Sequence, residues 1–110
     1  MTQPAHRHIY AERRHSIRVV TEFPTAFSTP DGEAGEGTAL DLSTRGCKFR
    51  TETPLTLNVE LELQIFIPGE TPPLVIPHAV VRWADNAEYG VEFQQIPEIS
   101  RRLLQDLFGL

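Results

Sequence analysis

Two short groups of polar residues have the side chains and the spacing to bind an anion or a purine. Arg14 and Arg18 are separated by four positions, and each guanidinium group offers a planar fork of N–H donors. Asp41, Ser43 and Gly46 lie within six residues of one another, a composition typical of a turn that closes on a polar ligand. Together the two groups predict a site that holds a nucleotide without performing chemistry on it.

Each residue type suits a particular contact. An arginine fork matches guanine O6 and N7 or two phosphate oxygens. The hydroxyl of Ser43 can donate to a phosphate or base acceptor, and Asp41 can either accept from guanine N1–H and N2–H or orient an arginine. Gly46 leaves room for a close approach of the backbone to a ligand.

Each residue also has a simpler interpretation. Arg14 and Arg18 could form weak surface salt bridges. Asp41 and Ser43 could bond the backbone of a local turn, an interpretation that is compatible with ligand contact. Gly46 could supply a positive φ at the start of a strand.

Other residues with reactive or aromatic side chains do not predict an enzyme, a metal site or a cofactor. His6, His8 and His15 lack cysteine or acidic partners at the spacing of a tetrahedral site. Cys47 is expected in the core, without a catalytic arrangement around it. Trp83 could stack on a base, but a tryptophan on a strand more often belongs to the core or packs against a helix.

The elements that must position these residues are mainly strands. Ile99, Leu103, Leu104, Leu107 and Phe108 recur at helical spacing, which predicts a helix at about 98–108. Alternation and turn residues predict a loop at 30–37 and strands at 17–29 (broken near Pro24), 38–42, 46–51, 59–67, 74–84 (interrupted at Pro77) and 89–93.

The composition fits one globular domain of 110 residues with 40 % hydrophobic and 23 % charged residues. Residues 1–18 hold four arginines against one glutamate, whereas residues 19–110 hold six basic and fourteen acidic side chains. An acidic body argues against nucleic acid as a partner, because phosphate contacts need an extended basic face. Without a signal peptide or an apolar run of about 18 residues, we expect a cytoplasmic protein with no membrane span.

The ordered motifs resemble the PilZ domain, a receptor module for cyclic di-GMP. Arg14 and Arg18 match its RxxxR motif, residues 41–46 match its D/N-x-S-x-x-G motif, and residues 81–93 are similar to its closing hairpin. The resemblance covers residue 12 to about residue 95. It implies a mainly β fold, a six-stranded antiparallel β-barrel with a C-terminal α-helix. The expected domain is 13–110, preceded by a flexible lead-in at 1–12.

The resemblance also implies the ligand and its contacts. Cyclic di-GMP is expected to contact the residues of both motifs, namely Arg14, Arg18, Asp41, Ser43 and Gly46. In this family a basic residue directly before RxxxR goes with binding of two intercalated cyclic di-GMP molecules, which would make Arg13 a ligand contact. The alternative is that Arg13 is a solvated charge.

The expected function is therefore a non-enzymatic cyclic di-GMP receptor. Binding would order the RxxxR segment around the nucleotide, and the signal would pass to an unidentified downstream protein. One alternative is a PilZ-like adaptor of pilus or secretion machinery that does not bind nucleotide. A second is a small barrel for single-stranded nucleic acid, which the acidic body and the few aromatic residues disfavour.

Overall fold

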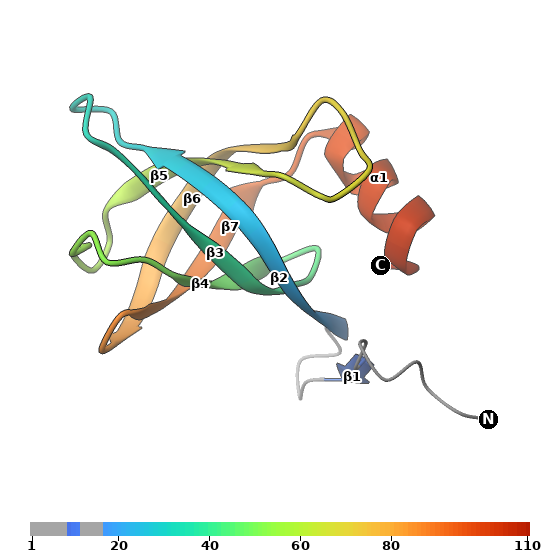
Figure 1. Ribbon diagram of the computed structural model, residues 1–110, viewed down its shortest axis with the longest axis horizontal. Helices are drawn as coiled ribbons and strands as arrows, with labels where there is room; N and C mark the ends of the chain where they lie inside the picture. The colour runs from blue at the N-terminus through green and yellow to red at the C-terminus, as the bar shows by residue number, and fades with distance from the viewer. Residues whose placement is uncertain (1–8, 12–16) are drawn as a thin grey trace.

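The computed structural model describes residues 9–11 and 17–110, which hold seven strands and one helix (Figure 1). In chain order these are β1 (Ile9–Ala11), β2 (Ile17–Ser28), β3 (Ala34–Leu42), β4 (Gly46–Arg50), β5 (Glu60–Ile65), β6 (Leu74–Asp85), β7 (Glu88–Gln95) and α1 (Glu98–Phe108).

Six of the strands close into an antiparallel barrel. The order of neighbours is β1-β2-β3-β4-β7-β6-β5, and β2 also pairs with β5. β2 is long enough for two partners on the same side: Ile17–Val19 pair with β1, and Thr25–Ser28 pair with β5. Closure leaves β2 to β7 without an open edge. The predicted mainly β, six-stranded barrel with a C-terminal helix is confirmed.

The barrel core is built by the alternation that the sequence shows most clearly in β5. Leu61, Leu63 and Ile65 are buried, while Glu60 and Glu62 between them are exposed. Successive side chains of a strand point to opposite faces, so one face of β5 fills the barrel and the other meets solvent.

β3 begins earlier than the turn residues predict. The sequence predicts a loop at 30–37, but the chain turns at 29–33 and β3 starts at Ala34. Gly35 and Gly37 lie in this strand at positions where neighbouring atoms leave no room for a side chain. A Cβ atom on Gly35 would lie 2.6 Å from the Phe27 ring, and one on Gly37 would lie 2.2 Å from the carbonyl oxygen of Arg50 and 2.7 Å from the Phe49 ring. Here glycine serves packing rather than turning.

Part of the predicted flexible lead-in at 1–12 lies in a short strand, β1. Ile9–Ala11 form a short antiparallel pair with the start of β2. A three-residue strand is too short for its alternation to be recognised in a sequence. Residues 1–8 and residue 12 of the predicted lead-in lie outside the described residues.

The irregularity predicted near Pro24 lies slightly earlier in β2. The register between β2 and β3 shifts between Val20 and Phe23, whereas Pro24 itself pairs with Thr38. The carbonyl oxygen of Pro24 accepts a hydrogen bond from the backbone N–H of Phe66, with 2.8 Å between the nitrogen and the oxygen. Proline therefore occupies a position of the ladder at which only its carbonyl group is needed.

The interruption predicted at Pro77 is a bulge inside a continuous β6. Leu63 of β5 pairs with Ile76, but Leu61 pairs with Ala79, so that two residues of β6 oppose one residue of β5. A bulge accommodates proline because the extra residue needs no ladder partner.

α1 covers one end of the barrel (Figure 1), as its leucine spacing predicts. Leu104 is fully buried in the barrel core. Other apolar side chains of the helix are partly buried against the same core: Leu103, Leu107 and Phe108. The Phe108 ring lies 6.0 Å from the Phe23 ring of β2, between centroids. In the described ranges, no helix is long and apolar enough to cross a membrane.

Ile99 departs from the predicted apolar stripe, because it is 77 % exposed. Its neighbour Ser100 faces the sheet instead, and the Ser100 hydroxyl donates to the carbonyl oxygen of Val75 at 2.8 Å. The first turn of α1 is therefore anchored by a hydrogen bond, and the buried apolar contact begins further along the helix.

The anchoring of α1 can be tested by truncating its buried leucine. Leu104→Ala is expected to lower the free energy of unfolding by about 2–5 kcal/mol, because it leaves a cavity in a close-packed core. Ile99→Ala on the same helix should change it by less than about 0.5 kcal/mol. Urea denaturation of both variants measures the difference, and equal losses would contradict the anchoring of α1 through Leu104.

Candidate functional site

Arg18, the described arginine of the first motif, meets the second motif where the start of β2 runs beside the end of β3. Val19 pairs with Leu42 and Val20 with Asp41, which brings Arg18 to the residues that lead into the β3–β4 turn. Nη1 of Arg18 donates a hydrogen bond to Oδ1 of Asp41 at 3.0 Å. This ion pair joins residues that are 23 positions apart in the sequence.

Asp41 is the buried partner of this pair. Its side chain is 8 % exposed, whereas that of Arg18 is 21 % exposed. Oδ1 of Asp41 also accepts from the backbone N–H of Lys48 at 2.7 Å, and a register shift between Ala39 and Asp41 bends β3 there. Of the two roles considered for Asp41, the observed one is to orient an arginine. A buried charge needs such donors, since desolvation otherwise makes it costly.

Ser43 organises the β3–β4 turn. It is buried, and its Oγ accepts from the backbone N–H groups of Arg45 at 3.0 Å and Gly46 at 3.1 Å. Its hydroxyl donates to the Gly46 carbonyl oxygen at 3.2 Å. These are the backbone contacts of the local-turn interpretation, and a direct contact of Ser43 with a ligand stays a prediction.

Gly46 is required by the neighbouring strand. A Cβ atom there would lie 2.2 Å from the carbonyl oxygen of Val91 in β7. Its φ does not lie in the left-handed region, in which the structure places other glycines, so the positive-φ interpretation is wrong. The close approach that Gly46 permits in this structure is that of β7, and its contact with a ligand stays a prediction.

A row of outward-facing positions crosses the barrel wall from this ion pair. In register across β3, β4, β7 and β6 lie Asp41, Lys48, Gly90 and Trp83. The Trp83 ring covers Gly90, because a Cβ atom on that glycine would lie 1.9 Å from Nε1 of Trp83. Trp83 is 45 % exposed, so the expectation that it belongs to the core is wrong.

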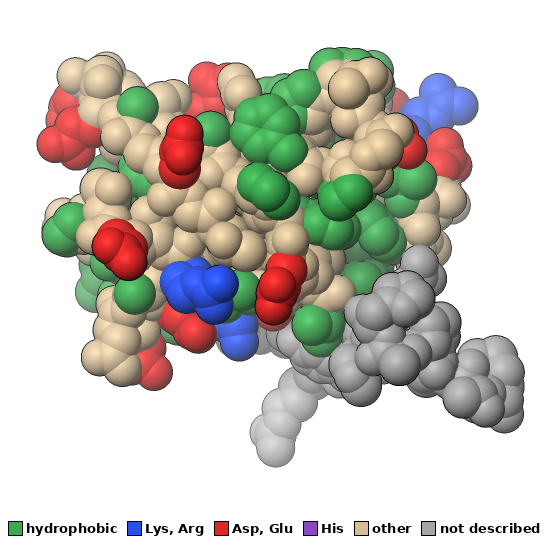
Figure 2. All heavy atoms as spheres, in the orientation of Figure 1, with side chains coloured by type: hydrophobic (Ala, Val, Ile, Leu, Met, Phe, Trp, Pro, Cys, Tyr) green, Lys and Arg blue, Asp and Glu red, His purple; other side chains and the backbone are tan. Residues whose placement is uncertain are grey.

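Two features that the motif analysis did not use adjoin the site. Arg45 is exposed in the β3–β4 turn, and the side chain of Lys48 is 40 % exposed beside Glu88, with 3.9 Å between Nζ and Oε1. Arg45 and Lys48 place positive charge beside the site, whereas acidic side chains are spread over the face shown in Figure 2.

The position of Trp83 on the outer wall could have been predicted by counting residues back from the turn at Asn86, because that register pairs Trp83 with a glycine.

Cys47 lies directly beneath the site and is buried, as predicted. Burial raises the pKa of its thiol from an ordinary value of 9.0 to about 12, the negative charge of Asp41 adds to this increase, and Arg18 opposes it. The thiol is therefore protonated near neutral pH and lacks the reactivity of a thiolate.

Several residues singled out in the sequence lie outside the described residues. These are Arg13 and Arg14 of the basic segment and the histidines His6, His8 and His15. In the part of the chain that the structure describes, no three His, Cys, Asp or Glu side chains gather in a group that could hold a metal ion.

Comparisons with known proteins agree with this fold. A family model described as the PilZ domain matches residues 12–109. The chain is similar to the PilZ domain of CeSA from a cellulose-synthesizing bacterium, with 20 % identity, a TM-score of 0.64 and coverage of 84 % of this chain and 95 % of that chain. It is also similar to the Bacillus subtilis inhibitor of motility MotI/DgrA, with 19 % identity, a TM-score of 0.68 and coverage of 86 % of this chain and 49 % of that chain. No curated protein matches.

The buried carboxylate can be tested for its part in stability. Asp41→Ala is expected to lower the free energy of unfolding by about 1–3 kcal/mol, because it leaves the Lys48 N–H and the Arg18 guanidinium without this acceptor. Asp41→Asn keeps an oxygen at the same position and should cost less. Urea denaturation measures both, with exposed Glu22 changed to Ala as the control. Equal effects at positions 41 and 22 would contradict this role.

The buried thiol yields a second measurement. In native buffer at mildly alkaline pH, Cys47 should react with a thiol reagent at least about a hundredfold more slowly than in urea, because it is both buried and protonated. Its folded pKa lies above the unfolded value of 9.0, so the stability it adds is present below pH 9 and is lost as the pH rises toward 12. Equal labelling rates with and without urea would contradict the burial.

Proposed function

Because the chain belongs to the PilZ domain family, we propose that it is a receptor for cyclic di-GMP that binds the nucleotide and does not transform it. The observation that carries the proposal is the ion pair between Arg18 and Asp41, 3.0 Å long. It joins the last arginine of RxxxR to the first residue of the second motif on the wall of the barrel. Both motifs would then serve one ligand.

Arg18 has the placement that this ligand requires. Asp41 holds the guanidinium group from the barrel side, and 21 % of the Arg18 side chain stays open to solvent. A phosphate oxygen or the O6 and N7 edge of guanine can reach an arginine placed in this way. Because the fold already positions the side chain, binding has less conformational entropy to overcome.

The rest of the basic segment completes the site in this proposal. Arg14 supplies the second fork, and the RxxxR segment wraps around the nucleotide against the barrel. Arg13 favours two intercalated molecules of cyclic di-GMP over one. The turn that Ser43 and Gly46 hold in shape fixes the second motif beside Arg18.

Trp83 gives a base a surface on which to stack. Its ring lies against Gly90 on the outer wall, in the same row as Asp41 and Lys48. Three strand spacings separate the row positions of Asp41 and Trp83, which is about 14 Å along the sheet. Stacking of a base on an exposed aromatic ring stabilises nucleotide complexes by about 1–3 kcal/mol.

The output passes to another molecule, in our proposal a downstream protein. A solved structure with this fold is named as an inhibitor of motility, although the chain spans only 49 % of it. In our proposal, the nucleotide-bound form is the one that contacts the partner.

Calorimetric titration tests the proposal directly. The wild type should bind cyclic di-GMP and not GTP, and Arg14→Ala and Arg18→Ala should each weaken binding by about 10- to 100-fold, since one arginine fork contributes about 1–3 kcal/mol. Arg50→Ala, an exposed arginine at the far end of β4, is the matched control. The fluorescence of Trp83, the one tryptophan of the sequence, should change during the same titration.

The outcomes distinguish ligand contact from a structural role for Arg18, and a nucleotide receptor from a nucleotide-independent adaptor. Because Arg18→Ala also removes a partner of Asp41, its urea midpoint is measured beside its affinity, and a folded variant with lost affinity supports ligand contact. Two ligands per wild-type chain and one per Arg13→Ala chain would support the intercalated pair. No heat and no change in fluorescence with the folded wild type would contradict the proposal and favour the nucleotide-independent adaptor.

A further inference from the structure

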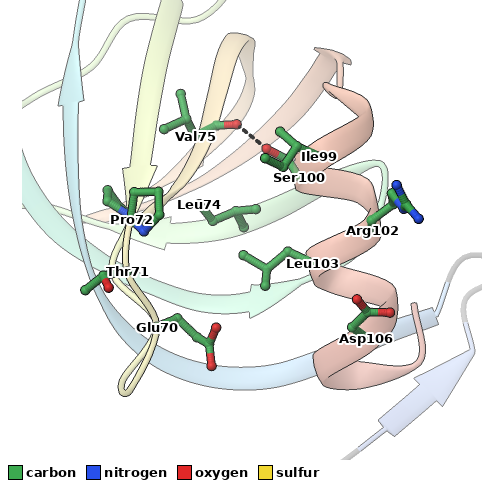
Figure 3. Close-up of a pocket in the computed structure, with 11 residues that line it drawn as sticks. Glu70, Thr71, Pro72, Leu74, Val75, Ile99, Ser100, Arg102, Leu103 and Asp106 are labelled. Atoms are coloured by element: carbon green, nitrogen blue, oxygen red, sulfur yellow. Dashed lines mark hydrogen bonds between the residues drawn. The ribbon is translucent and has the colours of Figure 1, made fainter.

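A groove that is separate from the candidate site lies between the β5–β6 connection and α1 (Figure 3). It has a volume of about 410 Å³, which is within the usual range of ligand pockets. Pro72 lines it from the connection, Leu74 from the start of β6, and Ile99 and Leu103 from the helix. None of these residues belongs to the two motifs or to the row that ends at Trp83.

The interior of the groove suits apolar side chains. The polar side chain at its sheet side is Ser100, and the hydroxyl of this residue already donates to the Val75 carbonyl oxygen at 2.8 Å. Sites for small polar ligands need a few polar groups that converge on the ligand. In Figure 3 the two carboxylates, Glu70 and Asp106, lie at one end of the groove and the Arg102 guanidinium group points away from it. The walls that Pro72, Leu74, Ile99 and Leu103 form therefore favour an apolar occupant.

Ile99 extends the apolar surface of the groove to the outside of the molecule. It is 77 % exposed, the largest exposed fraction among the large hydrophobic residues that the structure describes as exposed. The free energy gained by removing a hydrophobic side chain from water grows with the apolar area that is covered. An occupant that fills the groove and covers Ile99 would therefore gain more than one that fills the groove alone.

The charges at one end of the groove indicate which charged group the occupant carries beside its apolar side chains. Glu70 and Asp106 lie at the same end of the groove, and the guanidinium group of Arg102 points away from it (Figure 3). Among the described residues, neither carboxylate is in a salt bridge. The last turn of α1 contains no basic residue, so the negative end of the helix dipole adds to the potential at Asp106.

We propose that this groove docks a peptide segment of a partner protein, with large apolar side chains in the groove and a lysine or arginine beside Glu70 and Asp106. The apolar walls and exposed Ile99 provide the first part of this recognition, and the two carboxylates provide the second. The surface does not depend on nucleotide binding, because its residues are separate from Arg18, Asp41 and Trp83. It would serve a receptor and an adaptor equally.

A phage-displayed library of random peptides selected on the full chain tests the docking surface. The selected peptides should share large apolar residues next to lysine or arginine. Affinity of a synthesised peptide should fall about tenfold or more with Ile99→Asp, which places a charge where apolar area is to be covered. It should also fall with Glu70→Lys and Asp106→Lys, and in the wild type it should weaken as salt screens the charges.

Matched variants show whether these effects belong to the groove. Leu57→Asp changes another exposed hydrophobic residue, and Asp31→Lys reverses an exposed acid in the β2–β3 turn; both should leave peptide affinity unchanged. Cyclic di-GMP titration of the Ile99→Asp variant should match the wild type, which keeps this test separate from that of the nucleotide site. The proposal is overturned if no peptide is selected, if the peptides lack basic residues, or if their binding is indifferent to Ile99→Asp.

Discussion

The burial of one carboxylate determines how the candidate site is built. Asp41 lies in the barrel wall with its side chain 8 % exposed, and a charge in that position must be met by donors. Among the described residues, one donor is the backbone of β4 at Lys48, and another is the Arg18 side chain of β2. The same carboxylate therefore ties three neighbouring strands together and gives an arginine a fixed position at the surface. If the proposed function holds, stability and ligand recognition share this one contact, and a substitution there changes both.

β2 connects the two surfaces for which we propose binding. It carries Arg18 near its start, and after the register shift between Val20 and Phe23 it reaches α1 through the contact between the Phe23 and Phe108 rings. The helix that borders the groove thus packs on the strand that holds the arginine. The nucleotide surface is polar and relies on oriented donors, whereas the groove is apolar with charge at one end. Two surfaces of such different chemistry can hold a nucleotide and a peptide without competing for the same residues.

The sequence predicts the parts of this molecule that follow from local pattern. The alternation from Glu60 to Ile65 identifies β5, and the leucine spacing places α1, because each pattern reports which face is buried. The two motifs predict a shared site, and the turn contacts of Ser43 are among the interpretations that its sequence context offers. The burial of Asp41 is not predicted, since it depends on neighbouring strands. The position of Trp83 likewise depends on a neighbouring strand: the sequence suggests a core residue, and only the pairing of β6 with β7 places the ring over Gly90. The same dependence explains β3, whose glycines look like turn residues until the neighbouring strands are in place.

The glycines that lie against aromatic rings have a consequence for how this sequence can diverge. At two places in the barrel an aromatic ring occupies the volume that a side chain on the neighbouring strand would need: Phe27 over Gly35 and Trp83 over Gly90. Gly37 differs, because the nearest atom to a Cβ there would be the backbone carbonyl oxygen of Arg50, which no change of ring size would remove. Neither member of such a pair can change size alone, since enlarging the glycine produces a clash and shrinking the ring leaves a void. Substitutions at these positions should therefore be inherited as compensating pairs. In an alignment of related sequences, these pairs would mark strand register by covariation even after the motifs themselves had drifted.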